Sequence, residues 1–104
     1  MYNVTVSVDA PVAPEWLEWM KSVHIPDVLA TGLFAEAKIA RILAEESGGM
    51  AYSVQYYAYS RSHYERYEKD YAPRLRKEHQ DRFGAHTAAF RTLLDLIHQD
   101  APKP

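Results

Sequence analysis

Hydrophobic and polar residues alternate with a period of two over residues 2–9, which is typical of a strand with one apolar and one polar face. The apolar positions of this strand are Tyr2, Val4, Val6 and Val8. Residues 34–44 and 50–59 are also strand-like, and the turn-forming run 45–49 between them predicts a hairpin. A last strand is expected over residues 88–97. Its apolar side chains lie on both faces, so both faces must be covered.

Apolar residues at helical spacings of three and four follow from about Glu15 and predict a first helix. Pro14 suits its first turn, because the N–H that proline lacks would be unpaired there. We expect Pro26 to interrupt this helix, and a short helical turn over residues 27–30 to end at Gly32. The stripe that faces the core consists of Trp16, Leu17, Met20, Val23 and His24.

A second helix is expected to start at Ser62, because Ser62 and Glu65 have the spacing of a capping box. In that motif each side chain bonds the free backbone N–H of the other residue. Pro73 should kink or restart the helix, and Gly84 stands where a C-terminal cap is expected. Its apolar stripe consists of Tyr64, Tyr67, Tyr71, Leu75 and Phe83.

The order of these elements predicts an α+β domain of the ferredoxin-like β-α-β-β-α-β type. Such a domain has a four-stranded antiparallel sheet with both helices on one face. We expect a single domain over residues 1–97 and a polar C-terminal tail over residues 98–104. The other sheet face would be bare, and apolar residues of the second and fourth strands would need a cover. Two sheets packed face to face in a homodimer would form a dimeric α/β barrel. The alternative is a monomer whose long helices or tail wrap the edge.

The composition limits the classes of function. Cysteine is absent, which excludes disulfides, thiolate metal sites and cysteine nucleophiles. The formal net charge of −2 gives no basic excess for binding nucleic acid, and the third strand lacks the stacking motif of RNA-recognition domains. Glycine loops for nucleotide phosphates and the serine-hydrolase elbow are also absent, so we expect no cofactor. No segment is apolar enough to cross a bilayer, and no signal peptide is evident, so we expect a cytoplasmic protein without a membrane partner.

His24 and His79 are the first candidates for a ligand site, because each continues the apolar stripe of a predicted helix. Histidine exchanges protons near neutral pH, so either side chain could act as an acid or a base. The alternative is a packing role in which the imidazole is hydrogen-bonded to a backbone carbonyl. Neither residue belongs to a His-x-x-x-His or Glu-x-x-His pair, so no metal site is expected.

Gln55 and Tyr57 lie in the polar register of the third strand, which would face the bare side of the sheet together with Asn3 and Thr5. A chamber between two sheets that is lined by such groups suits a small organic ligand. A polar dimer interface with bridging waters would use the same residues. Arg91 stands among apolar neighbours in the last strand, where it could orient a carboxylate or pair with Asp95.

Six stretches spread over nearly the whole chain are distinctive, and the longest reads His24-Ile-Pro-Asp-Val-Leu-Ala-Thr-Gly32. The stretches cover residues 16–20, 24–32, 52–56, 72–76, 79–84 and 90–94. Together they resemble domain of unknown function family 4286, a set of small bacterial proteins. The resemblance implies the ferredoxin-like, dimeric barrel type already argued, and it supplies no catalytic residues.

Two functions stay open on this reasoning. The first is a homodimeric protein that binds a small organic molecule in a pocket between sheet and helices, whether or not it is an enzyme. The second is a non-enzymatic dimerisation or protein-interaction module whose polar sheet face serves only assembly. RNA binding is disfavoured, because the basic sheet surface that it requires is missing.

Overall fold

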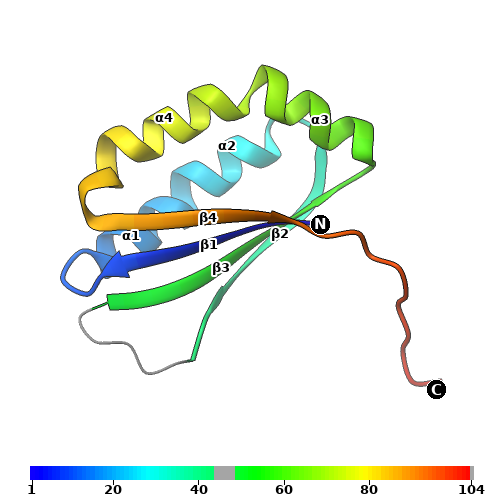
Figure 1. Cartoon of the computed structure of the whole chain (residues 1–104), viewed down its shortest axis with the longest axis horizontal. Coiled ribbons are helices and arrows are strands. Elements are labelled where there is room, and N and C mark those ends of the chain that lie inside the picture. The colour runs from blue at the N-terminus through cyan, green and yellow to red at the C-terminus, as the bar shows by residue number, and fades with distance from the viewer. Residues whose placement is uncertain (44–48, 104) are drawn as a thin grey trace.

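The computed structural model describes residues 1–43 and 49–103 and has the predicted β-α-β-β-α-β architecture. Its four strands form one antiparallel sheet in the order β2-β3-β1-β4, and the helices lie on one side of it (Figure 1). The strands are β1 (Tyr2–Asp9), β2 (Phe34–Arg41), β3 (Gly49–Ala58) and β4 (Thr87–Leu93). The helices are α1 (Ala13–Trp19), α2 (Ile25–Leu29), α3 (Arg61–Asp70) and α4 (Ala72–Phe83). The predicted turn falls largely on residues 45–48, which lie outside the described part.

The hydrophobic core lies between the sheet and the helices. β1 and β3 pair so that Val4 is opposite Val54 and Val6 is opposite Tyr52, which places the apolar side chains of both strands on the helix side. Trp16 from α1 and Leu75 from α4 close the core and are fully buried. Burial of each such side chain contributes about 1.5–3 kcal/mol to stability.

The first helix is interrupted just before Pro26, as predicted, but the interruption is a π turn and the chain stays helical through it. α1 passes into a π-helical turn, η1 (Met20–His24), which leads directly into α2, and the N–H of Ile25 donates to the carbonyl of Met20. In a regular α-helix the ring of Pro26 would collide with the carbonyl of Ser22, and a π turn is one way to relieve such a clash. Val23 was expected in the buried stripe but is 39% exposed.

The predicted capping box at Ser62 and Glu65 is wrong. Ser60 caps α3 instead: its backbone is extended, and its Oγ accepts a hydrogen bond of 3.2 Å from the backbone N–H of His63. The helix therefore begins at Arg61, three residues after the last residue of β3, Ala58. Glu65 pairs with the Arg61 side chain at 3.5 Å and plays no part in the cap.

The second helix restarts at Pro73, as predicted. Tyr71 separates α3 from α4 with a φ of −125°, and α4 ends at Gly84. Gly84 has a right-handed φ of −57°, so this cap does not use the left-handed freedom of glycine, and a 3-10 turn, η2 (Gly84–His86), leads into β4.

β4 is shorter than predicted, because its partner strand β1 starts at Tyr2, and only Met1 precedes the last residue pair, Tyr2 and Leu93. The N–H of Leu94 donates to the carbonyl of Met1 at 2.7 Å.

The second face of the sheet is uncovered in the part of the chain that the structure describes. The strand register places on this open face the side chains of Asn3, Thr5, Ser7, Ser53, Gln55, Tyr57, Ala88, Phe90 and Thr92. Phe90 is 63% exposed there, and the chain beyond Leu93 extends away from the sheet (Figure 1). Both faces of β4 were predicted to be covered. In the described part of one chain, nothing covers the face of β4 that carries Phe90. None of its helices has the length and apolarity needed to span a membrane.

Candidate functional site

His24 and His79 are neighbours between the helices and the sheet. Their ring centroids lie 6.0 Å apart, and the ring of Trp19 packs against both, at 5.2 and 5.9 Å. The indole Nε1–H of Trp16 donates to Nε2 of His79 at 2.9 Å. Because an indole nitrogen only donates, this bond makes Nε2 the acceptor and puts the hydrogen of neutral His79 on Nδ1.

Both imidazoles are neutral at pH 7. Burial lowers the pKa of His24 to about 4, with smaller contributions from His79 and from the positive charge of Arg91. Burial and the charge of Arg91 also lower the pKa of His79. Nδ1 of His24 is buried, and no described residue bonds it, so the backbone-carbonyl bond expected of a packing histidine is not made by this atom.

Two arginines meet at one hydroxyl beside these histidines. Arg91 reaches from the helix side of β4, and its Nε donates to the Tyr2 hydroxyl at 3.1 Å. Nη2 of Arg76, on α4, donates to the same oxygen at 2.9 Å and also pairs with Glu68. Nε of Arg76 is buried and has no partner among the described residues. Asp95 lies beyond the end of β4, and within residues 1–43 and 49–103 it forms no ion pair with Arg91.

Two hollows adjoin these groups. A small cavity of about 30 Å³ between sheet and helices is lined by His24, His79, Arg91 and Tyr2, among others, and could hold one water molecule. An open groove of about 470 Å³ runs between α4 and β4, within the usual range of small-molecule sites. The hollows share Arg76, His79, Ala89 and Arg91, so the groove and the cavity adjoin each other. We call the two together the cleft.

Gln55 and Tyr57 are not part of the cleft, because they lie on the open face of the sheet. The Tyr57 hydroxyl donates to Oε1 of Gln55 at 3.0 Å, and Nε2 of Gln55 donates to Oγ of Ser53 at 3.2 Å. Ser53 in turn donates to Oδ1 of Asn3 at 2.6 Å. The five residues singled out from the sequence thus form two separate groups, and only His24, His79 and Arg91 come together.

Sequence reasoning missed Tyr2 and Arg76. Tyr2 was assigned to the apolar face of the first strand, where its ring is indeed buried, but its hydroxyl had no assigned role. Arg76, in the second predicted helix, had no assigned role either. Its distance of three residues from His79 is the signal that could have placed both on one helix face.

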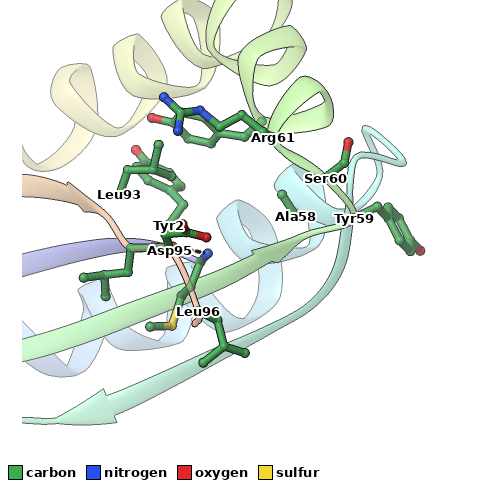
Figure 2. Close-up of a pocket in the computed structure, with 11 residues that line it drawn as sticks. Tyr2, Ala58, Tyr59, Ser60, Arg61, Leu93, Asp95 and Leu96 are labelled. Atoms are coloured by element: carbon green, nitrogen blue, oxygen red, sulfur yellow. Dashed lines mark hydrogen bonds between the residues drawn. The ribbon is translucent and has the colours of Figure 1, made fainter. Parts of the chain in front are cut away.

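A larger hollow of about 640 Å³ lies where β4 ends, beside the start of α3 (Figure 2). Leu96 and Asp95 of the C-terminal segment form part of its wall, and Tyr59 also lines it. Arg61, at its upper edge, is already paired with Glu65 at 3.5 Å. No histidine lines this hollow, and the buried polar atoms without partners lie elsewhere, so it is a weaker candidate than the cleft.

In the described ranges, no three histidine or carboxylate side chains gather closely enough to hold a metal ion.

Several solved structures share the fold. An ethyl tert-butyl ether d (EthD) family protein from Bacillus halodurans has a TM-score of 0.61 and 16% identity, over 91% of this chain and 99% of that chain. A dimeric ferredoxin-like protein from an uncultured marine organism has a TM-score of 0.60 and 14% identity, over 97% and 98%. HapK from Hahella chejuensis has a TM-score of 0.59 and 10% identity, over 99% and 100%. At these identities the likeness shows the ferredoxin-like fold alone.

The family comparison agrees with the resemblance seen in the sequence. No curated protein matches the chain. The match to a family covers nearly all of it, including both histidines, Arg91 and the whole sheet, and the family's description assigns no activity to any of these residues. Residues 1–97 match the model of the domain of unknown function DUF4286, and the chain belongs to this family.

Proposed function

We propose that the protein binds a small organic molecule in the cleft and that it acts as a homodimer. The observation that carries the proposal is the pair of buried polar atoms without partners, Nδ1 of His24 and Nε of Arg76. Buried polar groups are almost always hydrogen-bonded, and each one left unpaired costs about 1–3 kcal/mol. Both residues line the small cavity, so a molecule that enters through the groove can supply the missing bonds.

The cleft favours binding over proton transfer. A general base works best when its pKa lies near the operating pH, and the pKa of His24, at about 4, makes this imidazole a weak base. Nε2 of His79 is occupied by the indole of Trp16. Neutral imidazoles held this way are suited to fixed hydrogen bonds with a ligand.

The open face of the sheet supports the homodimer. It combines the exposed ring of Phe90 with a hydrogen-bonded row of polar side chains that includes Gln55 and Tyr57. A second copy would cover this surface by two-fold pairing of identical patches. The marine protein of similar fold is described as dimeric, which agrees with such an assembly.

The test is a nuclear magnetic resonance screen of a small-fragment library against the ¹⁵N-labelled protein. We expect binders to shift the signals of Ala89, Arg91 and the ring of His79, which all line the cleft. His24→Phe, which fills the cavity with an apolar ring, should abolish these shifts, whereas His98→Phe in the exposed tail should leave them unchanged. Folded variants are identified by their dispersed spectra.

Two results would oppose this proposal. Fragments that shift only residues around Arg61 would move the binding site to the hollow at the end of β4. A dimer that binds no fragment in the cleft would favour the second function, an assembly module whose open face serves only pairing. That alternative is supported by the polar row of Gln55 and Tyr57, whose side chains bond one another and Ser53 within the chain.

A further inference from the structure

The polar groups around the cleft are mostly hydrogen-bond donors. The Tyr2 hydroxyl already accepts from Arg76 and from Arg91, which uses both of its lone pairs and leaves its hydrogen for another acceptor. No acceptor for this hydrogen occurs among the described residues. Nε–H of Arg76 also lacks a partner, and neutral His79 carries a hydrogen on Nδ1. A ligand that satisfies these groups must be rich in acceptors.

The charges around the cleft favour an anion. Neither hollow is lined by an aspartate or a glutamate. Glu68 offsets the charge of Arg76, and Asp81 offsets that of Lys77 at 2.6 Å. Arg91 has no acidic partner in the described part of the chain, so its positive charge is uncompensated. Its field reaches both histidines, since it contributes to the lowered pKa of each.

We infer that the cleft selects small organic acids, and that Arg91 and the Tyr2 hydroxyl hold the carboxylate of the ligand. The inference rests on the proposed small-molecule function and adds the class of molecule. One uncompensated positive charge matches one carboxylate, and the planar guanidinium matches its two oxygens. The groove offers Pro73 and Ala89 for the apolar body of the acid.

The test compares benzoate with benzamide, which has a similar shape but no charge. Titrations of the wild-type protein, Arg91→Gln and Arg74→Gln are followed by the amide signals of the cleft. Arg74 is an exposed arginine of α4 that lines neither hollow, so it controls for the loss of one positive charge. We expect benzoate to bind the wild-type protein about 10-fold more tightly than benzamide, as charge-assisted bonds imply. Arg91→Gln should remove this preference, and Arg74→Gln should keep it.

Tyr2→Phe tests the hydroxyl separately. It should weaken benzoate binding about 5-fold, the cost of one hydrogen bond, without changing the binding of benzamide. A second readout is the pKa of His79 in the wild-type protein. Bound benzoate should raise the pKa of His79, because the negative charge of benzoate offsets the positive charge of Arg91. Loss of packing alone would not produce this shift.

The outcomes separate the two proposals. Equal binding of benzoate and benzamide, with no effect of Arg91→Gln, would overturn the preference for acids and leave the small-molecule function standing. If Arg74→Gln weakens benzoate binding as much as Arg91→Gln does, the role of Arg91 is overturned. The weaker binding would then come from the removal of one positive charge from the protein and not from a contact with Arg91. If neither probe nor any library fragment binds in the cleft, both proposals fail.

Discussion

His24 couples the cleft to the stability of the fold, because its imidazole is buried in a neutral form. Its pKa is about 4 in the folded protein and 6.5 in the unfolded chain, so the unfolded state binds more protons between these values. Stability contributed by the neutral ring is therefore complete above pH 6.5 and is lost as the pH falls toward 4. The loss from this residue should be about 2 to 4 kcal/mol.

We predict that His24→Gln flattens the pH dependence of unfolding between pH 7 and pH 4. The measurement is urea denaturation at several pH values in this range, for the wild-type protein, His24→Gln and His98→Gln. His98 lies in the exposed tail and should leave the wild-type slope unchanged. A slope that is the same in all three proteins would show that His24 is not the group responsible. His79 has a lowered pKa as well, so part of the slope should remain in His24→Gln.

At the scale of single elements, the start of α3 is set by Ser60. We predict that Ser60→Ala lowers the free energy of unfolding by about 1 kcal/mol, because the N–H of His63 loses its acceptor. Ser62→Ala, two residues inside the helix, should change it by less than about 0.5 kcal/mol. Thermal and urea denaturation of both variants provide the measurement. A larger effect of Ser62→Ala would mean that the helix starts at the capping box predicted from the sequence.

The elements that the sequence predicted best are those whose pattern records burial directly. Alternation over residues 2–9 matches β1, since one face of this strand is buried. The choice between Ser60 and Ser62 carries no such signal, because both serines lie near the start of α3, and which of them caps the helix depends on where β3 ends. The π turn before Pro26 was missed for a related reason. A regular helical spacing allows no extra residue in a turn.

The part of the candidate site that lies on two helix faces could be predicted from the sequence. The part that depends on contacts between long side chains could not. His24 and His79 were found because each continues an apolar stripe. The contacts of the Tyr2 hydroxyl join residues separated by 74 and 89 positions, and they depend on strand register and on arginine length. Gln55 was assigned from strand alternation to the face of the sheet away from the helices, and the register of β1 and β3 places it there.

At the scale of the whole molecule, the helices cover one side of the sheet and leave the other open (Figure 1). Phe90 projects from this open face opposite Thr5 of β1 and is 63% exposed. Burial of a phenylalanine contributes about 1.5–3 kcal/mol, and a two-fold interface would bury two copies. A proposed homodimer that uses this face should therefore depend strongly on Phe90.

We predict a solution mass twice that of the chain for the wild-type protein, measured by sedimentation equilibrium over a range of concentrations. Phe90→Glu should raise the dissociation constant of the dimer at least about 100-fold, because two rings are lost and two carboxylates are placed in the interface. Val23→Glu makes a similar apolar-to-acidic change on the helix layer, where Val23 is 39% exposed, and it should leave the dimer intact. A wild-type monomer at all concentrations would contradict the homodimer. Equal dissociation of both variants would place the interface elsewhere, because the open face would then have no special part in it.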